Sequence, residues 1–120
     1  MKKTILAGMM VVVSLFLIGC GGGPAKDYNG FAECLTGAGV VMYGSELCPH
    51  CMNVKKDFGN AFKHITYVEC NANMPGGDPE KCAEEGVQYL PTFKFGDGQK
   101  LVGELEFSLL AQKTGCELPE

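Results

Sequence analysis

The sequence lacks an excess of basic residues. Its 120 residues carry ten Lys and Arg against fourteen Asp and Glu, a formal net charge of -4 at pH 7. No basic patch is present, so nucleic acid is not an expected partner. Internal repeats are also missing, and the sequence is not that of a disordered tail, because 46% of its residues are hydrophobic and 20% are charged. At this length we expect one small domain.

A hydrophobic run of comfortable membrane-spanning length is missing as well. The N-terminal apolar run, residues 4–18, is too short for such a span. It follows the positively charged start Met1-Lys2-Lys3 and ends in small residues. This combination predicts an export signal. Without Lys2 and Lys3, eight Lys would stand against fourteen acidic residues, a net charge near -6.

The end of this leader, Leu17-Ile18-Gly19-Cys20, resembles the lipobox of bacterial lipoproteins. The resemblance implies a signal peptide at 1–19, cleavage before Cys20 and a diacylglycerol on its sulfur; multiple acyl chains anchor stably. Residues 20–29 would form a lipid-anchored flexible tether that reaches roughly 30 Å when extended, and residues 30–120 the domain. A plain secretory leader and an uncleaved anchor are alternatives. Gly21 is not the Asp that retains some lipoproteins at the inner membrane, which permits an outer-membrane or cell-surface location.

Cysteine, by contrast, is abundant, with seven residues in the chain. So many cysteines are unusual in a cytosolic protein without a metal. Two of them form the motif Cys48-Pro49-His50-Cys51, between an apolar run at 40–43 and an amphipathic stretch at 49–62. This context is typical of a thioredoxin-type dithiol. The first thiol opens a helix, whose free N–H groups and dipole favour the thiolate that attacks disulfides. The second lies one turn on, within reach to close the disulfide.

Hydrophobic periodicity and turn residues predict an α/β domain. We expect helices at 31–35, 49–62, 79–85 and 107–114, and strands at 40–43, 65–70, 92–95 and 100–102. Along the second helix, Lys55, Lys56 and Lys63 lie off the apolar face and are expected to be solvated. The first two strands should be parallel and the last two an antiparallel hairpin. The layout is thioredoxin-like: a central mixed β-sheet flanked by helices, with an extra helix at the N-terminus.

Six segments carry a closer resemblance: Phe31-Ala32-Glu33-Cys34-Leu35, Met42-Tyr43-Gly44, Cys48-Pro49-His50-Cys51, Tyr67-Val68-Glu69-Cys70, Tyr89-Leu90-Pro91-Thr92 and Thr114-Gly115-Cys116. Together they resemble the thioredoxin-like domain that is fused to bacterial and plant homologues of vitamin K epoxide reductase, over roughly residues 30–116. Such domains exchange disulfides with the membrane reductase, which passes electrons to a quinone. The resemblance implies a free-standing partner of a separately encoded membrane protein of this type, with a lipid anchor in place of the fusion.

The resemblance also implies what the residues of the dithiol do. Cys48 would be the nucleophile that forms mixed disulfides with clients, and Cys51 would resolve them. Pro49 and His50 would tune the Cys48 thiolate. The same Pro-His pair stands in the periplasmic oxidant DsbA, and a positive charge beside the thiolate makes the disulfide more oxidising.

A second signal is Leu90-Pro91-Thr92, a Pro just before a predicted strand. In thioredoxin-like proteins this Pro is typically cis, and Pro91 would shape the substrate groove while Leu90 offers backbone groups to a bound peptide. A trans Pro at a strand edge is the common case for X-Pro bonds and is the alternative.

Two positions depart from thioredoxins. Leu47 stands where they carry Trp before the first Cys, and Met42 stands where they carry a buried acid on the central strand. The handling of protons during exchange is therefore not given by the resemblance. Glu46 is near enough in sequence to be considered, with a simply solvated carboxylate as the alternative. His64 is expected to be a helix-end cation rather than a ligand.

With Cys20 lipidated, six thiols remain, and six cysteines allow fifteen pairings. Fixing Cys48–Cys51 leaves three, among which we expect Cys70–Cys82 and Cys34–Cys116. The first pair would staple the turn-rich loop after a strand, and the second would join the leading helix to the last. Closures of this kind contribute about 3 to 4.5 kcal/mol in the chain-entropy model. Alternatively, one of these pairs shuttles electrons to the dithiol.

The sequence thus predicts an extracytoplasmic, monomeric thiol-disulfide oxidoreductase without a cofactor or bound metal, acting on thiol- or disulfide-containing client proteins as an oxidant or disulfide carrier. A reductase or isomerase fed by another membrane donor is the first alternative. A metal-binding lipoprotein, with Cys48 and Cys51 as half a site, belongs to a different class. Structural zinc commonly needs two close pairs of ligands, and the other thiols are not so spaced. A purely structural lipoprotein is the last alternative.

Overall fold

The structure, a computed structural model, describes residues 26–120. The predicted signal peptide at 1–19, the lipidation site Cys20 and most of the tether at 20–29 lie outside the described residues. Within residues 26–120, no helix has both the length and the apolarity that a membrane crossing requires.

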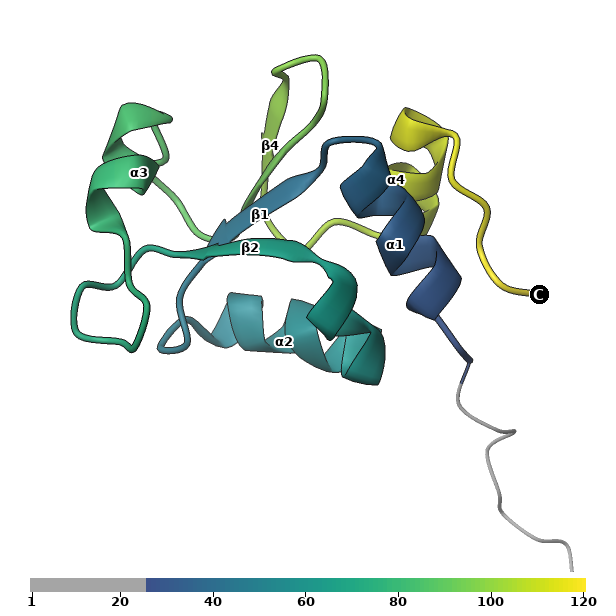
Figure 1. Ribbon diagram of the computed structural model, residues 1–120, viewed down its shortest axis with the longest axis horizontal. Helices are drawn as coiled ribbons and strands as arrows, with labels where there is room; N and C mark the ends of the chain where they lie inside the picture. Colours follow the sequence, from purple (N-terminus) through teal and green to yellow (C-terminus); the bar gives the residue numbers. More distant parts are fainter. Residues whose placement is uncertain (1–25) are drawn as a thin grey trace, which may run out of the picture.

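A four-stranded mixed sheet forms the centre of the domain, in the order β2-β1-β3-β4 (Figure 1). The parallel pair consists of β1 (Val41–Gly44) and β2 (Thr66–Glu69). On its other side β1 pairs antiparallel with β3 (Thr92–Lys94), which pairs antiparallel with β4 (Lys100–Val102). The α/β class, the order of the elements and the strand directions agree with the sequence prediction.

Helices cover both faces of this sheet unequally. The helices α1 (Asn29–Gly37), α2 (Pro49–Phe58) and α4 (Phe107–Thr114) contribute to the main core on one face. The short helix α3 (Pro79–Glu84) lies at the opposite end of the molecule from α1 and α4 (Figure 1). It contributes Cys82 to a smaller cluster with Tyr43 and Val68. The main core includes Phe31, Leu35, Met42, Val54, Phe58, Phe93 and Leu110.

The second helix is shorter than predicted. Instead of one helix over 49–62, α2 ends at Phe58, and a 3-10 helix, η1 (Gly59–His64), follows. Gly59 has a φ of +56°, which is left-handed backbone that glycine adopts readily and that ends an α-helix. Ala61 is buried all the same, so the apolar face continues through the change of helix type.

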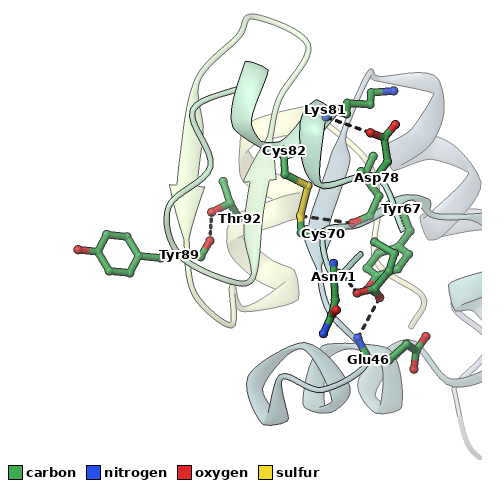
Figure 2. Close-up of a disulfide and its surroundings, with 11 residues drawn as sticks. Glu46, Tyr67, Cys70, Asn71, Asp78, Lys81, Cys82, Tyr89 and Thr92 are labelled. Atoms are coloured by element: carbon green, nitrogen blue, oxygen red, sulfur yellow. Dashed lines mark hydrogen bonds between the residues drawn. A yellow bond between two sulfur atoms is a disulfide. The ribbon is translucent and has the colours of Figure 1, made fainter. Parts of the chain in front are cut away.

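Two disulfides fix the periphery, and they are the same two pairs expected from the sequence. Cys34–Cys116 joins α1 to the segment after α4, across a sequence separation of 82 residues. Cys70–Cys82 joins the end of β2 to α3 across 12 residues (Figure 2). Beside it, the Asp78 carboxylate accepts a hydrogen bond of 3.0 Å from the Lys81 N–H and caps α3 (Figure 2).

Candidate functional site

Cys48 lies at the N-terminal end of α2, directly after the turn that leaves β1. It is the N-cap residue, with extended backbone, and Pro49 is the first helical residue. Proline suits that position because it has a helical φ and no N–H to leave unpaired. Ser45 holds the turn: its carbonyl accepts from the Cys48 N–H at 3.1 Å and its hydroxyl from the Leu47 N–H at 3.1 Å. The Cys48 thiol is half-buried and free.

The segment before β3 lies against this thiol. The Leu90–Pro91 peptide bond is cis, and the Cys48 Sγ donates to the Leu90 carbonyl oxygen at 3.7 Å. The same segment is held by the Thr92 hydroxyl, which donates to the Tyr89 carbonyl at 2.6 Å (Figure 2). Cys48 and the Leu90–Pro91 segment, more than forty positions apart in sequence, are therefore in contact, and Pro91 itself is fully buried.

Exposed apolar side chains stand next in sequence to these residues. Leu47 is 68% exposed, Tyr89 66% and Met52 41%. Each of them is adjacent in the chain to a residue of the dithiol or of the Leu90–Pro91 segment.

Cys51 is in the opposite situation, because it is free but fully buried. A Cβ placed on Gly44 would lie 3.0 Å from the Cys51 Sγ and 3.3 Å from the Tyr67 hydroxyl, so the sulfur and the phenol face the same small space. Burial raises the pKa of Cys51 to about 12, while a Ser45 backbone hydrogen bond and the charge of Lys55 act in the opposite direction. At neutral pH the Cys51 thiol is therefore protonated.

Beside this space, Glu69 is a buried carboxylate that is fully hydrogen-bonded. Its Oε2 accepts from the Tyr67 hydroxyl at 2.7 Å and from the Glu46 N–H at 2.9 Å, and its Oε1 accepts from the Asn71 N–H at 3.0 Å. Burial alone would raise the pKa of Glu69, but these hydrogen bonds outweigh it and the pKa lies below its ordinary value. Burial, and then Glu69, raise the pKa of Tyr67.

Lys55 does not follow the expectation that it is solvated. Only 14% of its side chain is exposed, and it forms an ion pair with Glu46. Its Nζ lies 4.0 Å from the centre of the Tyr67 ring and 5.2 Å from that of Phe62. The reason is tertiary: β2 brings Tyr67 next to α2, and the lysine is covered between the ring and Glu46. Glu46 itself is 42% exposed, and its carboxylate is paired.

His50 occupies the outer side of the motif. Its side chain is 70% exposed, and its Nδ1 lies 2.5 Å from Glu104 Oε1 in the segment after β4. The Asn53 amide donates to the same oxygen at 3.0 Å. These contacts, Asn53 first and then His50, lower the pKa of Glu104. The carboxylate fixes the imidazole ring beside the first turn of α2, and any positive charge on the ring is partly balanced there.

The structure thus brings Cys48, Cys51, Leu90 and Pro91 together, with His50 at the rim. Sequence reasoning missed Lys55, Tyr67, Glu69 and Glu104. Lys55 follows Cys51 by four residues, which places both on one helix face. Tyr67 and Glu69 stand in a segment that the sequence marks as a strand and as part of the family resemblance, but to which it assigns no role in the site. In the part of the chain that the structure describes, no three His, Cys, Asp or Glu side chains gather as a metal site would require.

Comparisons with known proteins give one informative relative. No family model matches the sequence. The thiol-disulfide oxidoreductase LTO1 of Arabidopsis thaliana is 35% identical over 96 residues, which cover 74% of this chain and 24% of that protein. The chain therefore spans about a quarter of the length of this curated relative. Thioredoxin O2 of Arabidopsis thaliana, solved in its oxidised state, is 20% identical, with a TM-score of 0.39, over 71% of this chain and 84% of that one.

Proposed function

We propose that this chain is a thiol-disulfide oxidoreductase that works through Cys48 and Cys51. One observation carries the proposal: the two thiols are free, one helical turn apart, and the first is accessible at the N-terminus of α2 while the second is buried. A helix N-terminus favours the thiolate of the first thiol. The relative that carries the name thiol-disulfide oxidoreductase supports the same reaction.

In this proposal Cys48 attacks or is attacked by the client sulfur, because it is the thiol that solvent reaches. Cys51 closes or opens the internal disulfide with Cys48. Leu90 would contact a client segment beside Cys48, and the fully buried Pro91 would shape this groove by positioning the Leu90 backbone, whose carbonyl already accepts a hydrogen bond from the Cys48 thiol. His50, with Pro49 before it, tunes the Cys48 thiolate, and Glu104 holds its ring. Clients are proteins with exposed thiols or disulfides.

We further propose that the protein works outside the cytoplasm, tethered through a lipid on Cys20, as an oxidant that exchanges disulfides with a vitamin K epoxide reductase-like membrane protein. The leader at 1–19 and the Cys20 lipobox support the location. The two closed disulfides support it too, since such bonds persist in oxidising compartments. The resemblance of six sequence segments to the fused domains of that reductase family supports the partner.

The test is to trap mixed disulfides in the native cell envelope. A full chain with Cys51→Ala keeps Cys48 but cannot resolve, so it should accumulate on clients and on its membrane partner as adducts that reductant releases. The matched control carries both Cys48→Ala and Cys51→Ala, and it should trap nothing. Adducts with a vitamin K epoxide reductase-like protein would support the coupling. An absence of reducible adducts with the single variant would contradict the proposed function.

The direction of electron flow needs a separate measurement, the equilibrium of the purified protein with reduced and oxidised glutathione. An oxidant should have a reduction potential well above that of glutathione. A potential near the glutathione range or below it would instead favour the alternative of a reductase or isomerase fed by another donor.

A further inference from the structure

Thiol-disulfide exchange at this site needs the Cys51 thiolate in either direction. When a mixed disulfide on Cys48 is resolved, the Cys51 sulfur attacks the Cys48 Sγ. The Cys48–client bond breaks, the Cys48–Cys51 bond forms, and the client sulfur leaves with the electron pair and takes up the proton that Cys51 released. In the reverse direction Cys51 is the leaving group. Cys51 is fully buried, which makes its thiolate costly, and Met42, which stands where thioredoxins carry an acid, cannot take up its proton.

The groups around Cys51 come from three elements. Lys55 belongs to α2 and Cys48 is its N-cap, Glu46 belongs to the turn before it, and Tyr67 and Glu69 belong to β2. The proton of the Tyr67 hydroxyl is donated to Glu69 Oε2 at 2.7 Å, so the phenol does not supply a hydrogen bond to the sulfur while that contact lasts. Glu46 and Glu69 are carboxylates, which disfavour a nearby anion.

Lys55 is the cation of this cluster. It follows Cys51 by four residues on α2, so both side chains leave the same face of the helix. Its Nζ lies 4.0 Å from the centre of the Tyr67 ring, and the edge of that ring shares the space beside Gly44 with the Cys51 Sγ. Because 86% of the side chain is covered, the charge is poorly screened by water.

We propose that the ammonium group of Lys55 stabilises the Cys51 thiolate during exchange, a role that rests on the thiol-disulfide oxidoreductase function proposed above. The central strand β1, Val-Met-Tyr-Gly, has no cationic side chain that could do this. Its ion pair with Glu46 and its position over Tyr67 hold the ammonium group on the sulfur side of α2.

Loss of the Lys55 charge should change the rate of the resolving step but not the reduction potential of the Cys48–Cys51 pair. In the reduced protein at neutral pH, Cys51 is protonated whether or not Lys55 is present, so the loss of the lysine leaves the equilibrium potential unchanged. The thiolate is needed only as the nucleophile or the leaving group. A loss of charge should therefore slow the resolving step alone, whereas groups that act on Cys48 should shift the potential.

The experiment follows the reaction of the reduced full chain with glutathione disulfide by acid quenching and mass spectrometry. Cys48 forms the mixed disulfide with glutathione, and Cys51 then displaces it. An opposite charge nearby shifts a pKa by about 1–3 units. For a thiol that is mostly protonated, each unit by which the pKa rises lowers the rate of attack about threefold. The thiolate fraction falls about tenfold, but the thiolate that remains is a better nucleophile. At neutral pH, Lys55→Met should therefore slow resolution about three- to thirtyfold and let the glutathione adduct accumulate.

The choice of the test variant and two controls separate the effect of the charge from that of its surroundings. Lys55→Met retains the apolar stem that covers Tyr67. Lys55→Arg keeps the charge over the ring and should resolve within about twofold of the wild-type rate. Lys56→Met removes the same charge from an exposed position one residue on and should change nothing. The reduction potential of all three variants should equal that of the wild type.

An unchanged resolving rate in Lys55→Met would overturn the proposal. So would a slow rate that Lys55→Arg does not restore, because the side chain would then act through its shape. A shifted potential in Lys55→Met would also overturn it. If instead the wild-type chain forms neither the glutathione adduct nor the internal disulfide, the proposed function itself fails, and this role fails with it.

Discussion

The two thiols of the Cys48-Pro49-His50-Cys51 motif are one helical turn apart, yet their surroundings differ in almost every respect. Cys48 is half-buried and donates a hydrogen bond to the Leu90 carbonyl, and its chain neighbour Leu47 is exposed. Cys51 is fully buried, between Gly44 and a cluster of charged and phenolic groups on β2 and α2. The difference teaches that one short motif produces two chemically distinct sulfurs, because the first turn of a helix crosses from the surface into the core.

The largest expected effect is on the alkylation rates of the two thiols taken singly. Among residues 26–120, Cys48 is the one free thiol in Cys51→Ala and Cys51 the one free thiol in Cys48→Ala, with burial, the largest cause of its raised pKa of about 12, still in place. We expect iodoacetamide to modify Cys51 at least about 100-fold more slowly than Cys48 at neutral pH, because the thiolate is the reactive form. In denaturant the two rates should converge. A ratio below about tenfold in the folded protein would contradict the comparison.

Much of the fold was predictable because its signals are local. The apolar run that forms β1, the turn between β3 and β4, and Gly115 after α4 each mark an element without reference to the rest of the chain. The break between α2 and η1 was missed because Ala61 stays buried on the same apolar face after Gly59. The spacing of apolar residues does not distinguish an α-helix from a short 3-10 helix such as η1.

The candidate site also has one part that the sequence predicts and one part that it does not. The motif around Cys48 and Cys51 is contiguous in sequence and was recognisable from it. The surroundings of Cys51 depend on the parallel pairing of β1 with β2, which sets Met42 opposite Tyr67 and Gly44 opposite Glu69. No local pattern gives that register. Lys55 was expected in solvent because, on an isolated helix, it lies off the apolar face; only the neighbouring strand covers it.

A smaller effect is expected from filling the space beside Cys51. In Gly44→Ala the new Cβ would lie 2.9 Å from the Tyr67 ring and 3.0 Å from the Cys51 Sγ, so both must move. Overpacking of this kind lowers the free energy of unfolding by about 1–3 kcal/mol, which urea titration measures. Gly37→Ala, at the end of α1 with open space around its Cβ, is the control and should be neutral or stabilising. Equal stability of the two variants would show that Cys51 is not tightly enclosed.

The smallest effect concerns the carboxylate that holds the Cys51 side together. The pKa of Glu69 is lower in the folded protein than in the unfolded chain, so its contribution is complete above the unfolded pKa of about 4.3 and is lost as the pH falls through the folded value. Glu69→Gln should therefore cost about 1 kcal/mol at neutral pH, and the difference from the wild type should shrink in acid. Glu104→Gln, which removes an equal charge from the exposed side near His50, should leave the stability nearly unchanged. Urea titrations at several pH values measure both variants. A Glu69→Gln deficit that stayed constant into acid would show that the side chain contributes by its shape, not by its charge.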